Sequence, residues 1–178
     1  MKKILIIILL FAAYQIGTGQ TIIPKQAVTL EIGGKGLIYS VNYEHRVQKN
    51  IVISAGLSFT HIKEKQTNKS SDIISFPVSA SYIFNLVNQK HYMEVGIGTM
   101  NLLTTGNLTA YGGATDFFMN PNLILGYRYY PSAKNWSIRA SFNPVYGTRS
   151  FADPKRTPFK PLGNRIQPWG GIGFSYRL

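Results

Sequence analysis

Hydrophobic and polar residues alternate with a period of two along most of the chain after residue 25. Gly, Pro, Asn or Ser separates each alternating segment from the next. This period indicates β-strands whose two faces meet different surroundings. The sequence predicts eight strands, at residues 26–33, 36–47, 50–62, 73–85, 90–103, 116–130, 135–147 and 166–178.

The connections between these strands differ in length in a regular way. Short ones are expected at 34–35, 48–49, 87–89 and 131–134, and long ones at 63–72, 104–115 and 148–165. Successive antiparallel strands put alternate connections at opposite ends, so all the long loops share one end. Transmembrane barrels have short periplasmic turns and longer extracellular loops. The pattern therefore predicts an all-β fold, an eight-stranded antiparallel up-and-down transmembrane β-barrel with periplasmic termini.

Charged residues indicate which strand face points inward. The acids and arginines within the strands share a face with Ser, Asn, Thr and Gly, and the other face carries Leu, Ile, Val, Phe and Tyr. Side chains fill the interior of a narrow eight-stranded barrel, and charges buried there need partners. We therefore expect a polar network in the lumen, formed by Glu31, Glu44, Arg46, Glu94, Arg128, Arg139 and Arg177. The alternative, a secreted soluble barrel, predicts an apolar cavity inside.

Aromatic residues gather near both ends of the expected strands. Rings at two such levels match the two interfaces of a membrane. The turn-side set is Tyr82, Phe84, Tyr127, Tyr129, Trp136 and Tyr176, and the loop-side set is Phe59, Phe117, Tyr146 and Trp169.

The chain begins with the features of an export signal. Lys2 and Lys3 precede an apolar run at 4–14, and small residues follow at 17–19. The run is shorter than the ~20 residues that a spanning helix needs, which argues against an N-terminal anchor. We expect a cleaved signal peptide at 1–19 and a single barrel domain at 20–178.

The strongly basic balance, a formal net charge of +12, has to be read together with export. Export argues against nucleic acid as a partner, so we expect the cations to lie in loops facing lipopolysaccharide or another anionic surface. The loop at 148–165 is the candidate interaction surface, through Arg149, Phe151, Lys155, Arg156, Phe159, Lys160 and Arg165. A surface glycan or a protein is a further possible partner. The alternative is a solvated loop that only compensates lipid phosphates.

Several segments resemble a known group of proteins. They are Phe76-Pro77-Val78-Ser79, Glu94-Val95-Gly96-Ile97-Gly98, Leu125-Gly126-Tyr127-Arg128-Tyr129 and the closing strand from Trp169 to Leu178. The whole chain after the signal resembles the small OmpA/OmpX-like and "outer membrane protein beta-barrel" families of Bacteroidota. The resemblance implies location in a Gram-negative outer membrane and biogenesis through the barrel-assembly machinery.

The sequence contains few of the residue patterns that catalysis requires. The chain has no cysteine, and His45, His61 and His91 lack metal-ligand spacing, so we expect no metal, no cofactor and no catalytic residue. One alternative is a lipid-modifying hydrolase similar to lipid-A deacylases, in which His61 would activate a hydroxyl of the 70–72 segment. Another is a small-solute channel. The main hypothesis is a non-enzymatic outer-membrane barrel with a filled lumen, acting in envelope structure or surface interaction.

Overall fold

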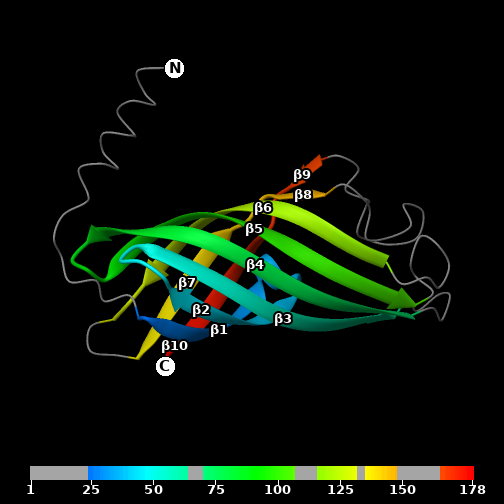
Figure 1. Ribbon diagram of the computed structural model, residues 1–178, viewed down its shortest axis with the longest axis horizontal. Coiled ribbons are helices and arrows are strands. Elements are labelled where there is room, and N and C mark those ends of the chain that lie inside the picture. The colour runs from blue at the N-terminus through cyan, green and yellow to red at the C-terminus, as the bar shows by residue number, and fades with distance from the viewer. Residues whose placement is uncertain (1–23, 64–69, 107–115, 132–134, 148–164) are drawn as a thin grey trace, which may run out of the picture.

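Eight antiparallel strands close into a barrel in the computed structural model, which describes residues 24–63, 70–106, 116–131, 135–147 and 165–178 (Figure 1). The elements are β1 Gln26–Gly33, η1 Gly34–Gly36, β2 Tyr39–Arg46, β3 Ile51–Lys63, β4 Ser70–Val87, β5 His91–Gly106, β6 Asp116–Tyr129, β7 Trp136–Phe142, β8 Val145–Gly147, β9 Arg165–Gln167 and β10 Gly170–Arg177. The seventh barrel strand comprises β7 and β8, and the eighth comprises β9 and β10. Pairing of β10 with β1 closes the barrel, which confirms the predicted fold class. Within these described ranges no helix has the length and apolar character to cross a membrane.

The faces of the strands are inverted relative to a soluble barrel. On β5, Ile97 is 66% exposed on the outer wall, whereas Glu94 is 1% exposed in the lumen. Large apolar side chains cover the outside of all the other barrel strands as well: Leu30, Val41, Leu57, Val78, Leu123, Ile138 and Phe174. The expected alternation of faces is confirmed, and the soluble barrel with its apolar cavity is excluded by the buried charges.

The wall is uneven in height. β4 and β5 have 18 and 16 residues, whereas β1, β2 and β10 have 8 each. The strand expected from residue 36 begins only at Tyr39, because the chain first makes the 3₁₀ turn η1. Positive φ angles at Gly33, Gly34 and Leu37 turn this segment into the barrel. The short connection between β1 and β2 therefore fills part of the lumen.

Strand seven, expected to be continuous over 135–147, breaks at Pro144. Proline has no N–H to donate to a neighbouring strand, and here its carbonyl accepts a hydrogen bond from Leu123 N at 3.1 Å. Asn143 N donates to the carbonyl of Trp169 at 2.6 Å. Beyond the break β8 meets β6 at one residue pair, Asn122 with Val145, and otherwise pairs with β9. The β8–β9 hairpin thus leaves the barrel wall (Figure 1).

Candidate functional site

Arg128 is the centre of an ionic layer across the lumen. It projects from β6 between Glu44 of β2 and Glu94 of β5. Its Nη1 and Nη2 donate to the two oxygens of Glu44 at 2.5 and 3.2 Å, and its Nε and Nη2 donate to those of Glu94 at 2.8 and 3.1 Å. Two forked pairs on one guanidinium join opposite sides of the barrel through strong, directional bonds.

Arg139 of β7 extends the ionic layer toward β1. Its Nη2 donates to Glu94 at 3.2 Å, and its Nη1 lies 3.5 Å from Glu31. Its Nε is 2.8 Å from Glu94 but lies outside hydrogen-bond geometry, so this contact is ionic only. Glu31 also accepts a bond from Ser141 Oγ at 3.3 Å. Glu94 is therefore shared by two arginines.

Lys35 is a member of the buried charge set that sequence reasoning missed. Its Nζ donates to Ser54 Oγ at 3.1 Å and Ser79 Oγ at 3.3 Å. Among the described residues, three carboxylates and three cations are buried: Glu31, Glu44, Glu94, Lys35, Arg128 and Arg139. The formal charges of this set balance, as charges away from water require.

A sequence signal for Lys35 existed in the glycines around it. A Cβ on Gly34 would lie 2.3 Å from Glu31 Oε1, and one on Gly36 would lie 2.2 Å from Ser40 Cβ. These positions therefore need glycine if the turn is to enter the lumen. A lysine between such glycines is more consistent with an inward turn than with the exposed loop position that we assigned to the cations.

Apolar clusters lie on both sides of the ionic layer. Val52, Ile83, Tyr92 and Tyr130 form one cluster at the turn side, where Arg128 also donates to the Tyr130 hydroxyl at 3.4 Å. The other cluster lies at the loop side and comprises Ile73, Met100, Leu102 and Val145, with Leu37 and Trp169 packed against it. Trp169 was expected at the membrane interface. That expectation is wrong, because its indole is drawn inward at the break between β9 and β10.

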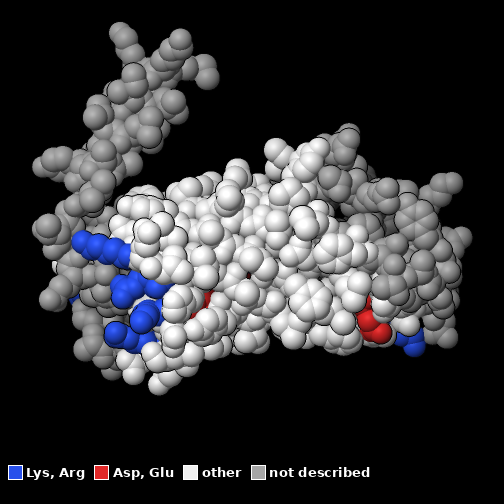
Figure 2. Space-filling view, viewed as in Figure 1, with Lys and Arg blue, Asp and Glu red and all other residues white. Residues whose placement is uncertain are grey.

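Two residues expected in the lumen network lie outside the ionic layer. Arg46 is half-buried at the end of β2, and Arg177 is exposed at the end of β10. The expected pairing of Arg177 inside the lumen is wrong, because Arg177 is the last residue of β10 and its side chain is exposed at the end of the barrel. Both belong to a basic end of the barrel, where Figure 2 shows Lys and Arg side chains gathered. Its residues are Lys25, Arg46, Lys49, Lys90 and Arg177.

His61 lies on the outer wall near the loop end and pairs with Asp72. The His61 Nδ1 atom is 2.6 Å from Asp72 Oδ1, and the two side chains are 53% and 46% exposed. Ser71 precedes Asp72 on the strand, so its side chain points to the other face of the sheet, where it is buried on the side of the lumen. The pair of His61 with Ser71 that a hydrolase would need is therefore not formed. Ser70, on the same face of the sheet as His61, pairs across the strands with Lys63.

The candidate interaction surface lies almost wholly outside the described residues. This applies to Arg149, Phe151, Lys155, Arg156, Phe159 and Lys160, and Arg165 is the first residue of β9. In the part of the chain that the structure describes, no group of three or more His, Asp or Glu side chains is placed to hold a metal ion.

Comparison with known proteins supports the fold alone. No family model and no curated relative matches the sequence. Among solved structures, Neisserial surface protein A is similar with a TM-score of 0.50, 13% identity and coverage of 86% of this chain and 93% of that one. CarO of Acinetobacter baumannii has a TM-score of 0.47, 14% identity and coverage of 90% and 100%. Ail of Yersinia pestis has a TM-score of 0.47 and 12% identity, with coverage of 86% of this chain and 93% of that one. The resemblance to Bacteroidota barrels stays a prediction.

Proposed function

We propose that this chain is an integral outer-membrane protein whose lumen is closed and whose work is done at its loop end. The role is non-enzymatic: the loops bind an anionic surface component, with lipopolysaccharide as the first candidate. The barrel below them acts as a rigid anchor in the membrane.

The observation that carries this proposal is the ionic layer. Arg128 joins Glu94 on the neighbouring strand to Glu44 on the opposite side of the barrel, and Arg139 contacts Glu94 and Glu31. Lys35 is buried beside this layer, one apolar cluster lies on its loop side, and another lies on its turn side. Eight-stranded barrels have interiors just wide enough for side chains. A lumen filled in this way favours an anchor over a channel.

The outer wall supports the membrane location. Its exposed side chains are apolar over the middle of β3 to β6, where Leu57, Val78, Ile97 and Leu123 meet the surroundings. Patches of this extent are not left in water by soluble monomers. The strands pair with one another around a closed sheet, with β1 joined to β10 and β5 to β6, and closure of this kind lets a sheet cross hydrocarbon without a helix.

The charge content of the 148–165 loop supports an anionic partner. That stretch contains a single acid, Asp153, and five cations, Arg149, Lys155, Arg156, Lys160 and Arg165. Loops on a rigid scaffold are where binding is commonly found. Cations clustered on one loop attract phosphate-bearing surfaces at a range set by ionic strength.

Binding of purified lipopolysaccharide to the barrel in phosphatidylcholine nanodiscs tests the proposal. The test variant replaces Lys155, Arg156 and Lys160 with Gln. The matched control replaces three turn-side cations, Lys25, Lys49 and Lys90, with Gln. If each contact contributes about 0.5 kcal/mol, the loop variant loses about tenfold in affinity at low salt. We expect the turn-side control to bind like the wild type.

Two outcomes contradict the loop proposal. Equal losses of affinity in both variants would assign binding to the overall charge of the protein. Absence of binding by the wild type would exclude lipopolysaccharide as the partner.

Planar-bilayer recording tests the closed lumen separately. We expect no conductance steps from the wild type, and reproducible steps would restore the channel alternative.

A further inference from the structure

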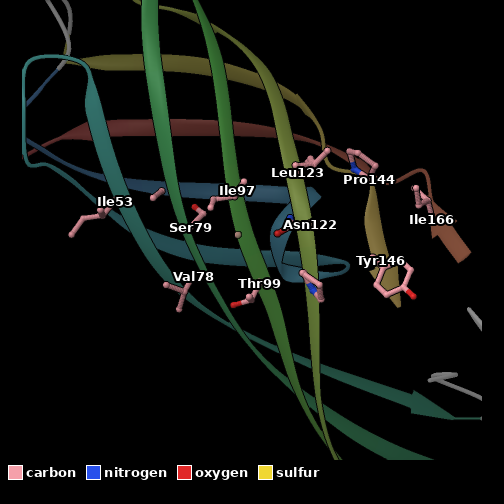
Figure 3. A pocket seen from close by; sticks show the side chains of 13 residues that line it. Ile53, Val78, Ser79, Ile97, Thr99, Asn122, Leu123, Pro144, Tyr146 and Ile166 are labelled. Atoms are coloured by element: carbon pink, nitrogen blue, oxygen red, sulfur yellow. The ribbon is translucent and has the colours of Figure 1, made fainter. Parts of the chain in front are cut away.

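An apolar groove lies on the outer wall, beneath the hairpin that leaves the barrel. It encloses about 840 Å³ between the barrel strands and β8–β9 (Figure 3). Ile53, Val78, Ile97 and Leu123 come from β3 to β6, while Tyr146 and Ile166 come from the hairpin opposite. All six side chains are more than one-third exposed, so the groove opens to the surroundings of the barrel.

The groove is hollow because short residues form its floor. Ala80 lies between Ile53 and Ile97 in one row across the strands, and Leu123 continues that row on β6. An alanine between two isoleucines leaves a depression. Pro144, where strand seven breaks, then directs the hairpin away from the wall and gives the depression a side.

Three polar groups at the groove have hydrogen-bond partners within the protein, whereas the oxygen of the buried Asn122 side chain has none. The Thr99 hydroxyl accepts a bond from Asn101 Nδ2 at 3.1 Å. Pro144 O accepts the N–H of Leu123, and Ser79 Oγ is bonded on the luminal side to Lys35. Buried water needs two to four polar partners, so water is a poor occupant here. An empty groove would also forfeit the dispersion contacts of its lining.

We infer that this groove holds an acyl chain of a membrane lipid from the leaflet around the loop-side half of the barrel. This inference rests on the proposed membrane location: the groove is continuous with the apolar outer wall, so hydrocarbon that covers the wall reaches the groove directly. A chain lying there contacts the wall on one face and the hairpin on another. It therefore exchanges more slowly than lipid elsewhere on the barrel surface.

Photolabelling in lipid vesicles tests this inference. The full-length barrel is reconstituted in phosphatidylcholine containing a small fraction of phosphatidylcholine with a diazirine midway along one acyl chain. We expect labelling at Leu123, Tyr146 and Ile166 to exceed several-fold the labelling at Ile172, an outward residue of β10 with similar exposure.

A pair of matched variants separates a held chain from bulk lipid. Ala80→Trp fills the floor of the groove, and Ala140→Trp adds the same ring to an outward alanine of β7, between Ile172 and Tyr127. We expect Ala80→Trp to reduce groove labelling to the level at Ile172 and Ala140→Trp to leave it unchanged. The electrophoretic shift of the folded barrel on heating controls for folding of both variants.

Three results would overturn the inference. Equal labelling of the groove and Ile172 would mean bulk lipid only. Labelling that persists in Ala80→Trp would mean that the groove is not where the chain lies. Zero-length or short chemical cross-links that join two copies through β8–β9 would make a second copy of this chain the occupant.

Discussion

The lumen and the outer wall are built from alternate residues of the same strands, and they impose different demands. Glu94 and Val95 are neighbours on β5, yet Glu94 contacts two arginines and Val95 faces outward with 46% exposure. Inside, each charge depends on particular partners on other strands. Outside, lipid accepts apolar side chains of many shapes. The comparison indicates that the lumen defines the structure and that the wall mainly has to remain apolar.

Removal of Glu94 is expected to have the largest effect on the free energy of unfolding. Glu94→Leu leaves Arg128 with Glu44 alone and leaves Arg139 with only the 3.5 Å contact to Glu31. Breaking a buried ion pair by removing one partner costs about 3–5 kcal/mol, because the other charge stays buried. Urea unfolding of the refolded barrel in phosphatidylcholine vesicles measures the loss. The control, Val95→Leu, should change little, and a similar loss in both variants would contradict the comparison.

The outer wall has to be apolar at the level of the hydrocarbon, and a charge introduced at the middle of a strand tests this requirement. Ile97→Arg puts a guanidinium in the middle of β5 on the lipid face, where the expected cost is about 2–4 kcal/mol. Leu86→Arg puts the same group on that face at the turn end of β4, where about 0–1 kcal/mol is expected. The same unfolding assay compares them. Equal costs at both depths would mean that hydrocarbon does not surround the middle of the wall.

The parts of this fold that follow a repeating pattern were predictable from sequence. Alternation assigned Glu31, Glu44, Glu94, Arg128 and Arg139 to the inner face, because a strand reverses its facing side at every residue. The sequence predicted that these glutamates and arginines pair with one another, but not which residues form each pair. Which arginine meets which glutamate depends on barrel register, and nothing in a single strand specifies it.

The parts that break the pattern were missed for physical reasons. Lys35 was assigned with the exposed cations because a short connection is usually a surface turn. Its burial depends on three-dimensional contacts of Gly34 and Gly36 with Glu31 and Ser40. Trp169 was assigned to the interface from its place near a strand end, but the breaks in strands seven and eight turn it inward. Irregular segments depend on tertiary contacts, which alternation does not encode.

The smallest expected effect concerns the contact between His61 and Asp72 on the outer surface, where lipid and water accept many side chains. Asp72→Asn removes the charge that His61 contacts at 2.6 Å, but both side chains are about half exposed. Water and salt screen such a pair, so the expected loss is about 0.2–1 kcal/mol. Urea unfolding at low salt and at 1 M salt measures it, and the difference from wild type should shrink at 1 M because charges are screened within about 3 Å there. A loss comparable to that of Glu94→Leu would mean that His61 and Asp72 support the loop end as strongly as the ionic layer supports the lumen.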